Sequence, residues 1–236
     1  MVESLLTLME TKSPSSEDFR MLRADVRIAN VKSLMITSTG PREGKSSTVA
    51  NLAVSVAQSG KSVLVVDADM RKPTLHKMFG LENGEGLSVA LNQDQDFLIY
   101  IRETSVPGLM LFTAGDVPSN PTELVGSERM KNLIEEASEQ FDMVIFDTPS
   151  VMGVMDAVTL AMMVDGVVLV LAANEVNIEY AIKAKDLLDK VGAKIIGAVL
   201  NNMDMNASEY SYYNYYNDEG VPNQKRKFGR RKHCNE

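Results

Sequence analysis

The chain has 236 residues, of which 44% are hydrophobic and 24% charged, so it is long enough for one well-buried domain of ordinary composition. Its single cysteine, Cys234, and two histidines exclude a disulfide framework and a zinc site, and this usage suits a reducing cytoplasm. No stretch approaches the ~20 apolar residues that span a bilayer, so we expect a soluble protein.

The formal net charge of −8 is unevenly distributed. Residues 221–236 carry +5, which leaves −13 for the remainder. A basic end on an acidic body suits contact with anionic lipid or an acidic partner, and it equally suits a solvated, disordered end. Nucleic-acid binding is not expected, because the predicted folded part is acidic.

Apolar runs rich in β-branched residues alternate with amphipathic segments, a pattern typical of a buried parallel sheet with crossover helices. We expect strands at residues 33–37, 62–66, 109–113, 143–146, 167–172 and 194–200, and helices at 16–28, 45–58, 127–140 and 178–191. The sequence therefore predicts an α/β fold over residues 1–203, a mostly parallel central sheet with helices on both faces. Residues 204–236 are expected to form a flexible tail, rich first in tyrosine and then in basic residues.

Three charged residues, Glu17, Arg20 and Arg23, are spaced three apart in the first predicted helix. This spacing places them on a loose stripe along one side of the helix. Such a stripe is either a solvated face with a weak Glu–Arg pair or a contact surface, and the residues alone leave both interpretations open.

The first predicted strand runs through a loop with glycine and proline into a helix that begins at Gly44-Lys45-Ser46. Backbone N–H groups and a helix N-terminus in this arrangement bind phosphate. Lys45 would bridge the β- and γ-phosphates, and the Ser46 hydroxyl would ligate Mg²⁺. The leading glycine of G-x-x-x-x-G-K-[ST] is replaced by Thr39. The residues expected at the nucleotide are Gly40, Pro41, Arg42, Glu43, Gly44, Lys45, Ser46 and Ser47.

Aspartates follow two further predicted strands: Asp67 and Asp69 after the second, and Asp147 after the fourth. Ligands of open α/β sheets bind at the carboxyl ends of the strands. Carboxylates gathered there, beside a phosphate loop, suit an ATP–Mg²⁺ site. The alternative is that strand-end aspartates cap the helices that follow them; the three segments together favour the metal site.

Asn201 and Asn202 come directly after the last predicted strand. One interpretation, implied by the resemblance to nucleotide-binding proteins that is described below, is that both contact the adenine base. The other interpretation is that they are turn residues that end the strand.

Five of the seven tyrosines lie within seven residues near the C-terminus, with polar residues between them. No apolar face forms at either the helical or the strand period, so their hydroxyls are expected to face solvent. Beside a phosphate donor, such a segment is a candidate phosphate acceptor. The tyrosines are Tyr210, Tyr212, Tyr213, Tyr215 and Tyr216.

These motifs resemble those of the bacterial tyrosine kinases of capsule and exopolysaccharide synthesis, most closely the soluble kinases of Gram-positive bacteria. The resemblance runs from Glu17 to the tyrosine cluster. It rests on the phosphate loop, the Walker A′ segment 65–73 ending Arg71-Lys72-Pro73, the Walker B segment 145–149, and the tyrosine tail.

The resemblance implies that Lys45 and Ser46 hold phosphate and Mg²⁺, that Asp67 accepts or orients the tyrosine proton, and that Asp69 and Asp147 hold the metal. It implies that the helix with Glu17, Arg20 and Arg23 packs subunits into a ring, possibly an octamer, that offers each tail to a neighbour. The implied partners are the cytoplasmic tail of a separate transmembrane activator, a cognate tyrosine phosphatase and protein substrates of polysaccharide synthesis. The implied location is the inner face of the cell membrane.

Two departures from the family pattern are local: Arg42 stands where glycine is frequent, and Ser150 where a second proline is common. The main alternative function is a positioning or partition ATPase, a nucleotide switch without kinase activity. Those proteins carry a second lysine where this chain has Gly40, and they lack the tyrosine tail. A non-enzymatic adaptor is disfavoured because Lys45 and the three aspartates are intact.

Overall fold

The computed structural model describes Leu5 and residues 13–93 and 96–203. The chain divides into two units, residues 1–203 and 204–236. The second unit, which holds the five predicted acceptor tyrosines, lies outside the described residues.

The described part is built on one seven-stranded sheet of order β3-β4-β2-β5-β1-β6-β7. All neighbouring strands are parallel except β3 and β4, so the predicted mostly parallel sheet is confirmed. β3 was not predicted, because it has two exposed residues and no hydrophobic pattern. The strands are β1 (Ser33–Ser38), β2 (Val63–Asp67), β3 (Arg102–Glu103), β4 (Leu109–Phe112), β5 (Met143–Asp147), β6 (Gly166–Ala172) and β7 (Ile195–Asn201).

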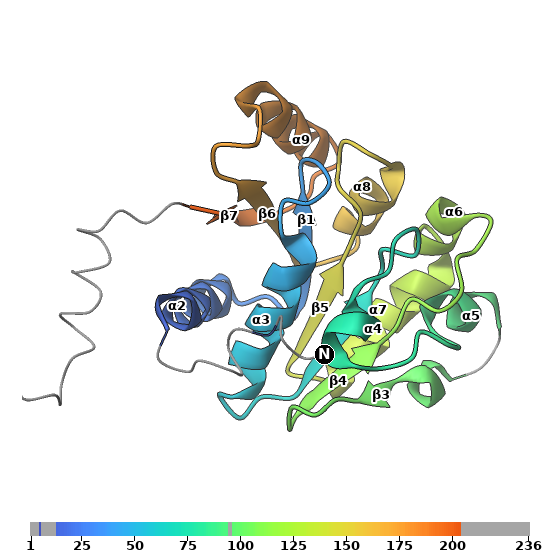
Figure 1. The fold of residues 1–236 in the computed structure, drawn as a ribbon. Helices are drawn as coiled ribbons and strands as arrows, with labels where there is room; N and C mark the ends of the chain where they lie inside the picture. The colour runs from blue at the N-terminus through green and yellow to red at the C-terminus, as the bar shows by residue number, and fades with distance from the viewer. Residues whose placement is uncertain (1–4, 6–12, 94–95, 204–236) are drawn as a thin grey trace, which may run out of the picture. The chain divides into compact units, whose positions relative to one another are not determined.

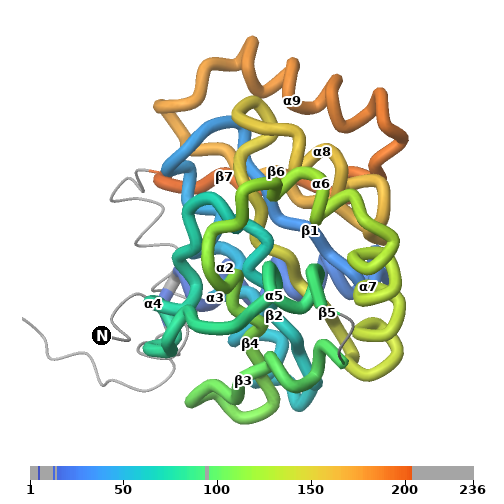
Figure 2. Tube along the Cα trace, turned by 90° about the vertical axis from the view of Figure 1, so that its right-hand side faces the viewer, coloured from blue at the N-terminus to red at the C-terminus, as the bar shows by residue number. Residues whose placement is uncertain are grey.

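Helices cover both faces of the sheet, as predicted (Figures 1 and 2). The first face carries α2 (Pro14–Ala29), α3 (Lys45–Ala57) and α4 (Leu75–Phe79). The second face carries α5 (Leu87–Asn92), α6 (Pro121–Val125), α7 (Glu128–Gln140), α8 (Met155–Ala161) and α9 (Ile178–Lys190), with a short 3₁₀ helix, η1 (Phe97–Tyr100). Among the described residues, no helix is both long and apolar enough to cross a membrane.

The central strands are apolar throughout because they are covered on both sides. In β1, Leu34 and Ile36 join the core beneath α3, whereas Met35 joins the core on the opposite face. In β2, the side chains of Val65 and Val66 divide in the same way. The period of two is therefore present but hidden, because hydrophobic side chains are required on both faces.

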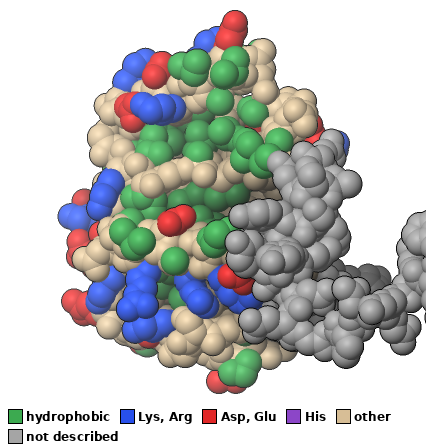
Figure 3. Space-filling model, turned by 90° about the vertical axis from the view of Figure 1, so that its left-hand side faces the viewer, with side chains coloured by type: hydrophobic (Ala, Val, Ile, Leu, Met, Phe, Trp, Pro, Cys, Tyr) green, Lys and Arg blue, Asp and Glu red, His purple; other side chains and the backbone are tan. Residues whose placement is uncertain are grey.

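The strand β7 forms one edge of the sheet and is more exposed than the others. Leu200 keeps 54% of its surface exposed, and hydrophobic side chains gather on this face of the molecule (Figure 3). A hollow of about 500 Å³ lies between α2, α3 and β7, and Ser47 and Asn201 are among the residues that line it.

Candidate active site

The phosphate loop and the aspartates meet at one edge of the sheet because β1, β5 and β2 are neighbours. In this register Asp147 pairs with Ile36 of β1 on one side and with Asp67 of β2 on the other. The loop from β1 to α3 starts three residues after Ile36. The structure therefore brings together the phosphate loop and both strand-end carboxylates, as the sequence predicted.

The loop reaches α3 through two residues of left-handed backbone. Gly44, the N-cap of α3, has φ 91°, and Arg42 has φ 65°. The positive φ of Arg42 explains why glycine suits this position, since a Cβ is disfavoured there. Gly44 offers no side chain to the first amides of α3, so these N–H groups face an anion-binding position. Pro41, Arg42 and Ser47 are exposed.

Side-chain hydrogen bonds from Glu43, within the phosphate loop, and from Asn201, at the end of β7, hold the loop in place. The Glu43 side chain is buried and its Oε1 accepts the Gly40 amide at 2.6 Å. Burial raises the pKa of Glu43, against the lowering effect of the backbone N–H donors. Asn201 Nδ2 donates to the Glu43 carbonyl at 3.0 Å and lies 1.9 Å from where a Cβ on Gly44 would be. Asn201 therefore contacts the phosphate loop, a contact that the sequence did not predict.

Lys45 points toward the Walker A′ loop, with its Nζ 3.7 Å from Asp69 Oδ2. The other oxygen of Asp69 accepts the Lys72 amide at 3.0 Å, which fixes the carboxylate in its own turn. Both side chains are mostly buried, so this ion pair is less screened than a surface pair.

Asp67 and Asp147 are completely buried. Asp67 Oδ2 accepts the Thr74 and Leu75 amides at 3.2 and 3.1 Å, so the capping alternative holds for this one oxygen, at the start of α4. Asp67 Oδ1 and both oxygens of Asp147 have no well-formed hydrogen bond within the described part of the chain.

Both buried carboxyls have raised pKa values. Burial, and next the charge of Asp147, raise the pKa of Asp67 well above its usual range. Burial raises the pKa of Asp147 to about 7, although Lys45 and the nearby Ser46 hydroxyl lower it. Burial disfavours the charged form of these two neighbouring carboxyls. A cation bound between them would stabilise the charged form.

The donor set fits a hard divalent cation that shares its ligands with a nucleotide. In the residues that the structure describes, no group of three or more His, Cys, Asp or Glu side chains is placed to hold a metal alone. The unpartnered oxygens of Asp67 and Asp147 are oxygen donors of the kind that Mg²⁺ uses together with water and phosphate oxygens.

Sequence reasoning missed an ion pair beside this site. Arg71 makes a two-pronged contact with Asp156 of α8, at 2.8 Å for Nε–Oδ2 and 3.1 Å for Nη2–Oδ1. Thr122 of α6 donates to the same carboxylate at 2.5 Å. Arg71 stands within the recognised Walker A′ motif, but its partner is 85 residues away and nothing in the local sequence marks it.

The predicted charged stripe of α2 divides between two roles. Glu17 and Arg20 form an ion pair at 2.5 Å, as a helical spacing of three allows. Arg23 instead donates to the Ser55 carbonyl of α3 at 2.6 Å. Asn202 directly follows β7 and is exposed, and its amide reaches Glu175 at 3.5 Å.

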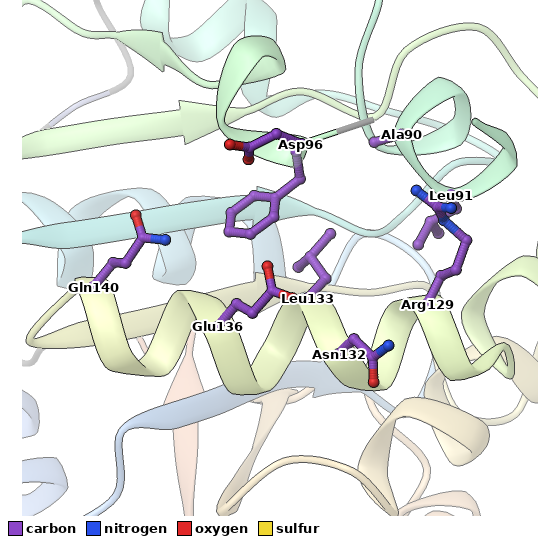
Figure 4. Close-up of a pocket in the computed structure, with 9 residues that line it drawn as sticks. Ala90, Leu91, Asp96, Arg129, Asn132, Leu133, Glu136 and Gln140 are labelled. Carbon is purple, nitrogen blue, oxygen red and sulfur yellow. The ribbon is translucent and has the colours of Figure 1, made fainter. Parts of the chain in front are cut away.

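A hollow of about 420 Å³ lies away from these groups, between α5, η1 and α7 (Figure 4). Arg129, Asn132, Glu136 and Gln140 line it from α7, and Asp96 lines it from the start of η1. None of the residues predicted at the active site is among its lining residues.

Comparisons with known proteins agree with this geometry. A family model described as ParA, NUBPL iron-transfer P-loop NTPase, matches residues 30–230. Tyrosine-protein kinase YwqD of Bacillus subtilis is 43% identical over 218 residues, which cover 90% of this chain and 92% of that protein.

Solved structures give the same result. The kinase domain of the Escherichia coli tyrosine kinase ETK is 32% identical with a TM-score of 0.83, covering 86% of this chain and 82% of that domain. The septum site-determining protein MinD of Pyrococcus horikoshii, complexed with Mg-ADP, shares the fold at 20% identity and a TM-score of 0.62, covering 77% and 76% of the two chains. The chain therefore belongs to the ParA-like P-loop NTPases and, within them, to the bacterial tyrosine-protein kinases.

Proposed function

We propose that this protein is an ATP-dependent protein-tyrosine kinase that phosphorylates tail tyrosines of a neighbouring copy. The observation that carries the proposal is the placement of Lys45, Asp69 and the buried Asp67–Asp147 pair around one phosphate loop. The similarity to tyrosine-protein kinases over most of the chain supports the same reaction.

The first task of the site is to hold the phosphates of ATP. The amides of the loop and of the first turn of α3 point toward them, and Lys45 adds a positive charge. Asn201 holds the Glu43–Gly44 peptide in place, which preserves the shape of the loop. Asparagines at this place contact adenine in related folds, and we propose this additional role for Asn201 and Asn202.

The second task is to hold the metal and the acceptor. Ser46, Asp69 and Asp147 would hold Mg²⁺, which neutralises charge on the transferred phosphoryl group. A tyrosine hydroxyl of pKa about 10 is a poor nucleophile at neutral pH. Asp67 has an unpartnered oxygen and is the base that would accept or orient its proton. Most of the rate enhancement is expected from positioning and charge stabilisation.

The acceptors we propose are Tyr210, Tyr212, Tyr213, Tyr215 and Tyr216, in the part of the chain outside the described residues. Tethering on a neighbouring subunit raises their effective concentration if the geometry allows them to reach the site. We propose that α2 packs copies into a ring, possibly an octamer. Each phosphorylated tyrosine adds roughly −1.5 to −2 charges, and this load is expected to loosen the ring.

The wider role rests on the resemblance to kinases of capsule and exopolysaccharide synthesis. We propose that the kinase regulates this synthesis at the inner face of the cell membrane, held there by a separate transmembrane activator. Its further partners would be a cognate tyrosine phosphatase and protein substrates of polysaccharide synthesis.

A second candidate function is a nucleotide switch without kinase activity, which the ParA family match favours. One experiment separates the two: the protein is incubated with γ-labelled ATP and Mg²⁺, with and without the cytoplasmic segment of the activator. The kinase predicts phosphotyrosine between Tyr210 and Tyr216 that is lost in Lys45→Met. ATP hydrolysis without phosphotyrosine in both conditions would instead identify the switch.

A further inference from the structure

Arg71 connects two segments of the active site that are distant in sequence. It lies two residues after Asp69, in the loop between β2 and α4. Its guanidinium group holds Asp156 through two hydrogen bonds, of 2.8 and 3.1 Å, and reaches the Thr122 hydroxyl at 3.1 Å. One loop and two helices, α6 and α8, therefore meet at the Asp156 carboxylate.

The Arg71–Asp156 pair combines opposite charges with a specific two-pronged hydrogen-bond geometry. The Asp156 side chain is 1% exposed, whereas that of Arg71 is 38% exposed. Burial alone would raise the pKa of Asp156, but the Arg71 and Thr122 hydrogen bonds hold it below its usual value. A planar guanidinium fits both oxygens of a carboxylate at once, and a lysine ammonium does not.

Asp156 is itself tied to the phosphate loop. The segment between β5 and α8 is held along the end of β1 and the start of the loop. The Thr148 hydroxyl donates to the Ile36 carbonyl at 3.2 Å, and the Val151 amide donates to the Ser38 carbonyl at 2.9 Å. The segment that begins at Asp147 and ends at Asp156 is therefore anchored to the end of β1, from which the phosphate loop leads to Lys45 at the start of α3.

These contacts form a closed circuit around the site. From Lys45 the circuit passes to Asp69 at 3.7 Å and along the Walker A′ loop to Arg71. From Arg71 the circuit continues through the hydrogen bond to Asp156. From Asp156 it follows residues 148–155 back to the end of β1, where Thr148 donates to the Ile36 carbonyl. Without Arg71, the Walker A′ loop would lose its side-chain connection to Asp156 on this side of the circuit.

We propose that Arg71 is a positioning residue that fixes the Walker A′ loop, so that Asp69 faces Lys45 and the metal position. This inference rests on the proposed kinase function. Phosphate binding by the loop amides and Lys45 does not depend on Arg71, but the gain in nucleotide affinity that Mg²⁺ gives does. Phosphoryl transfer depends on it for the same reason.

The test compares Arg71→Lys, which keeps the charge but loses the two-pronged contact, with the wild type. Losing a partner that orients a metal ligand typically costs ~10–100-fold in metal affinity or activity. We therefore expect kcat for tail phosphorylation to fall about 10-fold or more, and the KM for ATP, which is measured with Mg²⁺, to rise. Affinity for ADP without Mg²⁺ should stay the same, while the increase produced by Mg²⁺ should shrink.

The matched control is Lys61→Met, which breaks the exposed Lys61–Asp142 pair, a contact of 2.8 Å between residues outside the proposed site. Asp156→Asn should reproduce the kinetic effect of Arg71→Lys, and the double variant should lose little more than either single one. Each variant is assayed well below its own Tm, which removes a simple effect of stability.

If Arg71→Lys lowers only the Tm and keeps both kcat and the Mg²⁺ gain in ADP affinity, the pair is structural and the inference is wrong. The ADP titration also separates this failure from failure of the kinase function. A wild type that makes no phosphotyrosine refutes the kinase, and the Mg²⁺ gain in ADP affinity still tests the role of Arg71.

Discussion

Asp67 and Asp147 occupy paired positions at the ends of the neighbouring strands β2 and β5, and both are completely buried. Burial disfavours ionisation of both; the charge of Asp147 adds to this effect at Asp67, and the charge of Asp69 adds to it at Asp147. The folded protein therefore holds a destabilising pair of carboxyls at the place where a metal-bound nucleotide is proposed to bind.

The stability of the nucleotide-free protein should fall as the pH rises from about 4 to about 7. Asp147 has a folded-state pKa of about 7 and an unfolded value near 3.8, so the folded state binds more protons in this window. Where the folded state holds the extra proton, stability decreases with pH. Asp147→Asn removes this titration and should be more stable than the wild type at pH 8.

The measurement is Tm by calorimetry between pH 4.5 and pH 8.5 without nucleotide or Mg²⁺. A gain of ~1 kcal/mol in the free energy of unfolding raises Tm by ~2–4 °C in a domain of this size. Asp142→Asn is the control, because Asp142 is an exposed aspartate with a lowered pKa. Parallel pH curves for the wild type and Asp147→Asn would contradict the raised pKa.

Gly44→Ala should destabilise the protein and abolish nucleotide binding. A Cβ at Gly44 would lie 1.9 Å from Asn201 Nδ2, and φ is 91°. Backbone strain and overpacking each cost ~1–3 kcal/mol, so we expect roughly 2–4 kcal/mol in urea unfolding. The double variant Gly44→Ala/Asn201→Ala should recover the packing part only. If the second substitution recovers nothing, Asn201 does not hold the loop as described.

Arg42→Gly should be more stable than Arg42→Ala, the reverse of the usual order. At ordinary positions glycine is less stable than alanine by roughly 0.5–1 kcal/mol. At φ 65° the Cβ of alanine costs ~1–2 kcal/mol, which outweighs the extra freedom of glycine in the unfolded chain. Urea unfolding of the two variants compares them directly. An alanine variant of equal or greater stability would be inconsistent with the left-handed backbone.

Arg20→Ala and Arg23→Ala should behave differently although both lie on α2. The Glu17–Arg20 pair is half-exposed, and such pairs contribute at most ~1 kcal/mol, so Arg20→Ala should keep its Tm and lower the assembly mass. Arg23→Ala loses the bond to the Ser55 carbonyl and should lower the Tm as well. Light scattering and calorimetry measure both effects. An unchanged mass for Arg20→Ala would remove it from the interface.

The sequence predicted the central strands and the convergence of Lys45 with the three aspartates, because a parallel sheet brings strand ends to one edge. It missed β3 and the short helices, whose two to seven residues carry too little pattern. It also missed the contacts of Arg71 with Asp156 and of Asn201 with Glu43. These contacts join residues 85 and 158 positions apart, and they depend on how the loops pack after the sheet has formed.

The central claim is tested by separating donor from acceptor. One chain carries Lys45→Met and keeps its five tail tyrosines, and the other keeps Lys45 but has all five changed to phenylalanine. The two are mixed with ATP, Mg²⁺ and the cytoplasmic segment of the activator, and phosphate is mapped by mass spectrometry. We predict phosphotyrosine between Tyr210 and Tyr216 of the Lys45→Met chain in the mixture and none when that chain is incubated alone. A mixture that hydrolyses ATP but leaves those tyrosines unmodified would contradict phosphorylation in trans at this site.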